Sequence, residues 1–233
     1  MDKAFKDETL PKRLGRVAQS ELLQTWPRLV PFSPLKRCTD IIGAAILLVF
    51  FAPLLALIAA ILYFRYGGDV LFRHERLGRN GDRFACLKFR TMHQDSQKHL
   101  TDFLAKHPLM RQEWERTQKL AHDPRVHGLG RILRKSSLDE LPQLINVLRG
   151  EMSLVGPRPI TSAEAEKYAE DFAYYLALRP GITGLWQVSG RNDTTYAERV
   201  AFDVQYYKNR TFLLDIKILL RTIAVVFTGK GAC

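Results

Sequence analysis

The feature that most constrains this chain is an apolar segment near its N-terminus, residues 41–64, in which no side chain is charged. As an α-helix, these roughly two dozen residues would be about 36 Å long, which is enough to cross a bilayer core of about 30 Å. The alternative is a buried helix of a soluble domain. A buried helix of this length normally has a polar face, however, and this segment has none. The segment therefore predicts a membrane helix.

Basic residues lie on both sides of the apolar segment. Lys36 and Arg37 precede it, Arg65 follows it, and further arginines stand at positions 73, 76, 79 and 83. Basic flanks favour the cytoplasm, so a re-entrant hairpin would keep both inside, whereas a spanning helix would place one outside. Pro53 removes a helical hydrogen bond at the middle of the segment and favours a bend. Because proline is also tolerated as a kink in spanning helices, these features favour re-entry only slightly.

The charge of the whole chain indicates an anionic partner. Its formal net charge is +11, from 35 basic and 24 acidic residues, and this excess suits nucleic acid, acidic lipid or a phosphorylated substrate. The three cysteines, Cys38, Cys86 and Cys233, are scattered and imply no disulfide framework, which fits a reducing cytoplasmic side. Residues 1–34 are polar, lack the apolar core of a signal peptide, and are expected to form an arm.

The remainder alternates short extended pieces with helices. Extended pieces on either side of the turn at residues 78–81 predict a hairpin within residues 70–92. Helices are expected over residues 95–120 with a break at Pro108, from about Ser137 to a stop at Gly150, over 163–178 and over 196–208. Residues 153–159 and 179–186 are expected to be loops.

The C-terminal segment, residues 212–228, is apolar but contains Asp215, Lys217 and Arg221. These charges argue against a second span. They favour a helix lying in the membrane interface, with its basic side chains reaching towards headgroups. A core helix of the soluble domain is an equal alternative.

Asp139 and Glu140 are adjacent carboxylates at an expected helix start. The helix N-terminus and the neighbouring Arg134 and Lys135 favour their ionised form. Such a carboxylate can attack phosphorus, or hold Mg²⁺ against a diphosphate. The spacing Ser137-x-x-Glu140 also matches a capping box, and taken alone it favours that structural role. Pro142 weakens the capping interpretation, because it would lie inside the first turns.

Three basic residues are candidates for binding phosphate. Lys88 and Arg90 alternate, so in an extended segment they would face the same way, although a solvated strand edge explains them equally well. Arg158 lies between Pro157 and Pro159, whose fixed φ angles make a stiff loop. Such a loop suits a bidentate phosphate contact; the alternative is a tight turn whose arginine faces solvent.

Several motifs, in order, resemble the bacterial sugar transferase family, the polyprenyl-phosphate hexose-1-phosphate transferases or monotopic phosphoglycosyl transferases. The resemblance runs from about Leu35 to Val226. The short architecture of the chain, with one apolar segment, is similar to that of members that initiate exopolysaccharide synthesis. The motifs that carry it are Lys88-Phe-Arg-Thr-Met92, Asp123-Pro-Arg-Val126, Leu133-Arg-Lys-Ser-Ser-Leu-Asp-Glu-Leu-Pro-Gln143, Asn146-Val-Leu-Arg-Gly150, Met152-Ser-Leu-Val-Gly-Pro-Arg-Pro159 and Arg179-Pro-Gly-Ile-Thr-Gly-Leu-Trp-Gln187.

The resemblance implies a membrane-associated α/β fold with a re-entrant helix hairpin and interfacial amphipathic helices. It implies a catalytic dyad at Asp139 and Glu140, with the aspartate as nucleophile and both carboxylates engaging Mg²⁺. The basic residues that it assigns to phosphate and nucleotide fall on Lys88, Arg134 and Arg158. Relatives often carry serine before the central proline of the re-entrant helix, whereas this chain has Ala52.

These observations together predict an arm at residues 1–34, a membrane helix at 35–66, and a cytosolic catalytic domain at 67–233 on the inner membrane of a bacterium. The predicted reaction transfers hexose-1-phosphate from a UDP-hexose to a polyprenyl phosphate and releases UMP. The predicted substrate-binding residues are Lys88, Arg90, Arg134, Pro157 and Arg158. Membrane lipids are expected partners and nucleic acid is not, and the sequence leaves the sugar and the oligomeric state open. The rivals are a basic membrane-surface scaffold and a glycosyltransferase that releases UDP.

Overall fold

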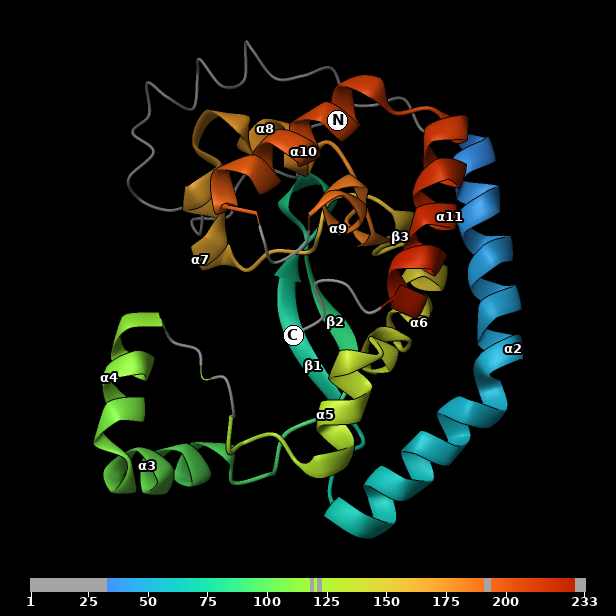
Figure 1. Cartoon of the computed structure of the whole chain (residues 1–233). Coiled ribbons are helices and arrows are strands. Elements are labelled where there is room, and N and C mark those ends of the chain that lie inside the picture. Colours follow the sequence, from blue (N-terminus) through green and yellow to red (C-terminus); the bar gives the residue numbers. More distant parts are fainter. Residues whose placement is uncertain (1–32, 118–119, 121–122, 191–193, 229–233) are drawn as a thin grey trace.

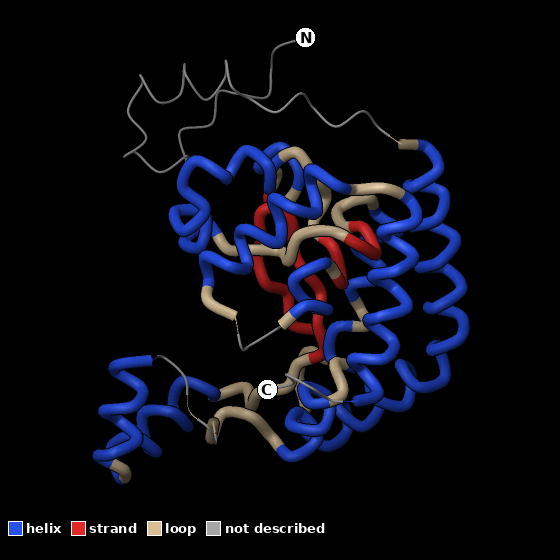
Figure 2. The backbone as a smooth tube through the Cα atoms, turned by 45° about the horizontal axis from the view of Figure 1, so that its top comes forward, coloured by secondary structure: helices blue, strands red, loops and turns tan. Residues whose placement is uncertain are grey.

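The computed structural model describes residues 33–117, 120, 123–190 and 194–228 (Figure 1), with only the backbone described at residues 113, 115–117 and 226–228. The arm predicted for residues 1–34 therefore lies almost entirely outside the described residues. The described chain combines two small sheets with helices, and one long helix, α2, runs along one side of the molecule (Figures 1 and 2).

Helix α2, Pro34–Tyr66, contains the whole apolar segment. It begins with proline at its first position, after Ser33, whose side chain caps the backbone NH of Lys36 at 3.4 Å. It is long and apolar enough to cross a membrane, and little of its apolar stretch is buried, which argues against the soluble-core alternative. Pro53 lies inside it, and the helix changes direction partway along but stays continuous (Figure 1). The expected hairpin is therefore not confirmed.

Polar contacts fix the first turns of α2 onto the body. Asp40 is buried, and its Oδ1 accepts hydrogen bonds from Ser153 Oγ at 3.0 Å and from the backbone NH of Leu154 at 2.9 Å. Arg37 donates to the carbonyls of Val147 and Leu148, which lie at the C-terminal end of helix α6, Gln143–Arg149. A cation suits that end of the helix dipole.

The predicted hairpin is confirmed. Strands β1, Leu71–Leu77, and β2, Arg83–Phe89, are antiparallel and in register. The short 3₁₀ turn η1, Arg79–Gly81, joins them. Asn80 and Gly81 both have positive φ there, the backbone conformation in which asparagine and glycine are most readily accommodated.

The second sheet was not predicted. Strands β3, Ser153–Val155, and β4, Gly181–Thr183, pair in parallel inside segments expected to be loops. They approach so closely that a Cβ atom on Gly156 would lie 2.4 Å from the carbonyl oxygen of Arg179, and one on Gly181 would lie 2.1 Å from the nitrogen of Gly156. Strands of three residues are too short to show an alternating pattern.

The helical regions follow the sequence in part. Helices α3, Ser96–Lys106, and α4, Pro108–Thr117, break at Pro108 as expected and extend away from the sheets (Figure 1). The helix expected over residues 163–178 is divided into α7, Ser162–Ala165, the 3₁₀ segment η3, Glu166–Asp171, and α8, Phe172–Leu176. The division falls at Ala169, which has φ +45°. Helices α9, Leu185–Ser189, and α10, Tyr196–Asn209, follow.

Helix α11, Phe212–Thr228, has the bounds expected from the sequence. One face enters the core through the buried Asp215 and Ile218, while Leu213, Leu220 and Ile223 are exposed. The two alternatives for this segment therefore describe opposite faces of one helix, and its place in a membrane interface stays a prediction.

The main core lies where α6, the β3–β4 pair, α10 and α11 meet. Its largest fully buried members include Leu144, Met152, Tyr206 and Ile218. A second cluster joins the C-terminal half of α2 to β2 and to helix α5, Gly128–Lys135, through Ile58, Leu62, Phe89 and Leu133. This second cluster holds the segment that follows α5, which carries the acidic pair.

Candidate functional site

Asp139 and Glu140 lie on a single 3₁₀ turn, η2, Leu138–Glu140, between α5 and α6. The capping-box interpretation is wrong: Ser137 has φ +57° and its side chain makes no capping bond, because a capping residue needs an extended backbone. Glu140 turns instead to Lys88, whose Nζ lies 2.5 Å from Glu140 Oε1. The α-helix begins only after Pro142 and ends at Gly150 in the left-handed conformation, as the glycine stop predicts.

The carboxyl group of Asp139 is buried. Burial and then the charge of Glu140 raise its pKa to about 6, while Lys88 and Arg134 oppose the rise. The sequence-based argument weighed the helix start and the cations, and the structure adds the larger effect of desolvation. With a pKa near 6, the ionised form of Asp139 still predominates at pH 7.

The structure brings two of the predicted cations to the dyad. Lys88 reaches it from β2. Arg134 reaches towards it from α5, with its Nε donating to Thr91 Oγ1 at 2.8 Å. Arg90 follows the end of β2, and its guanidinium lies beside Gly68, in the loop after α2. The expected role of Arg90 in substrate binding stays a prediction.

Pro157 and Arg158 lie in a loop that is held at both ends. The backbone NH of Gly181 donates to the carbonyl of Pro157 at 2.7 Å. On the other side, Tyr175 OH accepts from the backbone NH of Ile160 and donates to the carbonyl of Leu77 at 2.6 Å. These bonds supply the stiffness that the prolines predicted.

The guanidinium of Arg158 does not simply face solvent. It lies 5.5 Å from the centre of the Trp186 ring, within the range of a cation–π contact. Burial raises the pKa of the Cys86 thiol to about 11. The same pKa is also shifted by the nearby charges of Lys88, Glu140, Arg76 and Arg158. The Arg158 loop and the dyad therefore flank the same part of β2.

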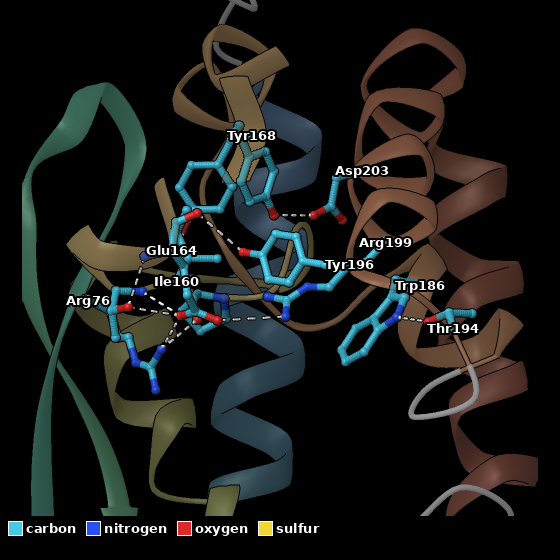
Figure 3. A network of polar contacts seen from close by, with 12 residues as sticks. Arg76, Ile160, Glu164, Tyr168, Trp186, Thr194, Tyr196, Arg199 and Asp203 are labelled. Carbon is cyan, nitrogen blue, oxygen red and sulfur yellow. Dashed lines mark hydrogen bonds and ion pairs between the residues drawn. The ribbon is translucent and has the colours of Figure 1, made fainter. Parts of the chain in front are cut away.

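A polar network behind this loop was missed by sequence reasoning (Figure 3). Arg76 on β1 donates to Glu164 Oε2 at 3.1 Å and to the carbonyl of Pro159 at 3.4 Å. Arg199 on α10 is buried, with its guanidinium 3.9 Å from Glu164 and 4.7 Å from the ring centre of Trp186. The network thus ties β1, α7 and α10 to the loop that carries Arg158.

Part of this network had a signal in the sequence. Tyr196 and Arg199 are three residues apart on an expected helix and share a face, and in the structure the Arg199 guanidinium lies 5.0 Å from the Tyr196 ring centre. The pairing of Arg76 with Glu164 had none, because 88 residues separate the two side chains.

The carboxylate oxygens of Asp139 and Glu140 are potential ligands for a metal ion. Among the residues that the structure describes, no group of three or more histidine, cysteine, aspartate or glutamate side chains is arranged to hold a metal ion. Mg²⁺, however, is usually bound by one or two carboxylates together with substrate phosphates. Asp139 and Glu140 fit such an ion if it arrives with a diphosphate, and Lys88 would then give up part of its contact with Glu140.

Together, these features define a class: a membrane-associated protein whose site suits phosphorylated substrates. Comparison with known proteins identifies the family. The family described as bacterial sugar transferase matches residues 32–229, so the chain belongs to the bacterial sugar transferase family.

Three relatives illustrate the similarity. The exopolysaccharide production protein ExoY of Rhizobium meliloti is 49% identical over 84% of this chain and 87% of its own length. The undecaprenyl-phosphate galactose phosphotransferase of Salmonella typhimurium is 51% identical over 85% of this chain but only 41% of its own length. The UDP-glucose:undecaprenyl-phosphate glucose-1-phosphate transferase of Caulobacter vibrioides is 41% identical over 84% of this chain and 71% of its own. The chain is accordingly an enzyme of the phosphoglycosyl transferase type.

Proposed function

We propose that this chain transfers hexose-1-phosphate from a UDP-hexose to undecaprenyl phosphate at the cytoplasmic face of the inner membrane and releases UMP. The names of the Salmonella and Caulobacter relatives support the lipid acceptor and a hexose phosphate as the transferred group. The name of the Rhizobium relative supports a role in exopolysaccharide production. Galactose and glucose are the candidate sugars.

The observation that carries the proposal is a buried carboxylate, Asp139, held between Glu140 and the cations Lys88 and Arg134. In the first step, an oxygen of Asp139 attacks the phosphorus that bears the hexose, the bond from that phosphorus to the UMP oxygen breaks, and UMP leaves. In the second step, an oxygen of the lipid phosphate attacks the same phosphorus. The bond to Asp139 breaks, which gives polyprenyl-diphospho-hexose and restores the carboxylate.

The remaining side chains neutralise and orient charge. Lys88 and Arg134 oppose the charge that builds up at the dyad, and Arg158 is suited to a two-pronged contact with a phosphate group. Mg²⁺, held by Asp139 and Glu140, would screen the diphosphate and stabilise the leaving UMP.

The surface of the molecule fits a lipid substrate. Exposed apolar side chains run along α2, among them Val49 and Phe50, and continue on α11 with Leu213 and Leu220. A polyprenyl phosphate keeps its phosphate at the membrane surface, so a site beside these helices would meet it there. Basic residues at both ends of α2 favour a re-entrant arrangement with the whole domain in the cytoplasm.

The test measures UMP and the protein mass before lipid is added. Enzyme mixed with UDP-sugar and Mg²⁺ should release up to about one equivalent of UMP per active site, and intact-protein mass spectrometry should find a hexose-phosphate adduct on Asp139. Asp139→Asn should abolish the burst and turnover, and Glu140→Gln should be severely impaired in turnover. Asp102→Asn, an exposed carboxylate change on α3, is the matched control and should keep both.

The outcomes separate the alternatives. Intersecting initial-rate lines, with no adduct and no burst, would replace the covalent route with direct attack by the lipid phosphate. Release of UDP instead of UMP would identify a glycosyltransferase, and release of neither would leave a basic membrane-surface scaffold.

A further inference from the structure

Trp186 lies in the last of the sequence motifs, residues 179–187, and the transfer mechanism described above does not use it. It is the second residue of α9, and its side chain is buried. Its ring nitrogen Nε1 donates to Thr194 Oγ1 at 2.7 Å, which satisfies the one polar group of the indole (Figure 3). The hydrogen bond fixes one edge of the ring and leaves its π system for other contacts.

Two guanidinium groups contact this ring. That of Arg158 lies 5.5 Å from the ring centre, and that of Arg199 lies 4.7 Å from it. Arg199 is buried, and its guanidinium is also 5.0 Å from the ring centre of Tyr196. A buried cation packed against both rings leaves the indole little room to turn. The Trp186 ring is therefore a fixed surface for the side chain of Arg158.

The Arg158 guanidinium is left with its hydrogen-bond donors unused. The residue is half-buried, and within the part of the chain that the structure describes no carboxylate or carbonyl accepts a hydrogen bond from its side chain. A carboxylate partner would compete with a phosphate for these N–H groups. An aromatic ring attracts the cation through its π electrons and occupies no donor. Contact with Trp186 therefore restrains the side chain without blocking it.

The contacts continue from Arg199 back to the loop that carries Arg158. Arg199 lies 3.9 Å from Glu164, and Glu164 pairs with Arg76 at 3.1 Å (Figure 3). Arg76 also donates to the carbonyl of Pro159, the residue after Arg158, at 3.4 Å. The backbone of the loop and the side chain that it presents are thus anchored to one continuous set of residues.

We propose that Trp186 is a positioning residue, which holds the guanidinium of Arg158 in the orientation that binds a phosphate of the UDP-sugar. This role rests on the proposed function, in which Arg158 contacts such a phosphate, and adds a residue that acts through Arg158. A side chain that is already oriented loses less conformational freedom on binding. The ring should therefore strengthen phosphate binding.

The test is isothermal titration calorimetry of UDP into the full-length protein in detergent with Mg²⁺. UDP carries the diphosphate but no hexose, so no transfer takes place during the measurement. Trp186→Phe and Trp186→Leu both lose the bond to Thr194, but only phenylalanine keeps an aromatic face. Trp186→Phe should bind UDP within about threefold of the wild type. Trp186→Leu should bind it about five- to thirtyfold more weakly, as expected for loss of a partly desolvated cation–π contact.

Two comparisons separate positioning from a merely structural role. Val188→Ala, which removes packing from the same helix, is the matched control and should bind UDP like the wild type. Arg158→Gln should weaken UDP binding about tenfold or more. When Trp186→Leu is added to Arg158→Gln, the further loss should be less than about twofold, because the side chain that the ring positions is gone. If Trp186→Leu is unfolded in its far-UV circular dichroism, Trp186→Met, whose flexible side chain fills irregular gaps, replaces it in both backgrounds.

The outcomes distinguish this role from the proposed function. Unchanged UDP binding in Trp186→Leu, an equally weak Trp186→Phe, or the same loss from Trp186→Leu with and without Arg158 would overturn the role of Trp186 alone. Unchanged binding in Arg158→Gln would overturn the contact between Arg158 and phosphate, and the role of Trp186 with it.

Discussion

At the scale of single residues, Asp139, the proposed nucleophile, has an environment that opposes its ionisation. Its pKa of about 6 predicts that the rate of UMP release in the absence of lipid falls about tenfold per pH unit below that value and is level above it. Glu140→Gln should shift the fall in rate to lower pH, because the charge of Glu140 raises the pKa of Asp139. Rapid-quench measurements between pH 5 and 8 provide the test, and a rate that does not change below pH 6 would contradict the role of Asp139.

The same burial predicts a gain in stability when the charge is removed. A carboxyl whose pKa rises from 3.8 to about 6 on folding loses stability as the pH rises through that window, by up to about 3 kcal/mol above it. Asp139→Asn should therefore unfold at a higher temperature than the wild type at pH 8, with a smaller difference at pH 5. Thermal unfolding in detergent at the two pH values measures this, and a variant that is less stable at pH 8 would show that Asp139 is stabilised by contacts outweighing its desolvation.

Arg158 differs from a simple positive charge in its shape and its partner. Arg158→Lys keeps the charge but loses the planar group that lies over Trp186 and can contact phosphate at two points. We expect kcat/KM for the UDP-sugar to fall at least about tenfold. Arg73→Lys, on the exposed surface of β1, is the control and should be neutral. Near-normal turnover and affinity in Arg158→Lys would rule out the two-pronged contact.

At the scale of elements, the course of α2 through the membrane is a prediction that labelling can test. The basic flanks and Pro53 favour both ends in the cytoplasm. In a variant without native cysteines, single cysteines at position 30 and at Glu75 should both resist an impermeant reagent in intact cells. Pro53→Leu should expose one of them in a fraction of the molecules, because it restores the helical hydrogen bond. If only one of the two sites is labelled in the protein that retains Pro53, α2 is a spanning helix.

The elements that the sequence predicted well are those with local signals. The turn before β2, the break at Pro108, the stop at Gly150 and the whole of α11 each follow from residues close to the feature. Strands β3 and β4 could not be predicted in this way, because their pairing joins two three-residue segments and depends on close contact between Gly156 and Gly181. The break at Ala169 also lacked a signal, since alanine normally favours a continuous helix.

At the scale of the whole molecule, the ion pair between Lys36 and Asp215 joins the start of α2 to α11. Lys36→Met should lower the free energy of unfolding by about 1–3 kcal/mol, less than for a fully buried pair because Lys36 is partly exposed. Lys36→Met/Asp215→Leu should recover part of the loss. Arg83→Met breaks an exposed pair with Glu75 and should cost under about 1 kcal/mol. A Lys36→Met variant as stable as Arg83→Met would show that the two helices are held by other contacts.

Only those residues of the candidate site that belong to sequence motifs could be predicted. Lys88, Arg134 and the dyad could be named from motifs, and the structure places all of them together. Glu164 and Arg199, which support the Arg158 loop, come from distant parts of the chain, and only the fold brings them near Arg76.

The parallel pairing of β3 with β4 also imposes an order in time. The bonds that hold the Arg158 loop from the β4 side involve Gly181, so the loop cannot reach its final shape on a growing chain until β4 has been made. Between the end of α2 at Tyr66 and the end of β4 at Thr183 lie 117 residue steps (183 − 66), which take about 6–23 s at 5–20 residues per second. During that interval the apolar helix is already available to the bilayer, so α2 can meet the membrane before the Arg158 loop has taken its final shape.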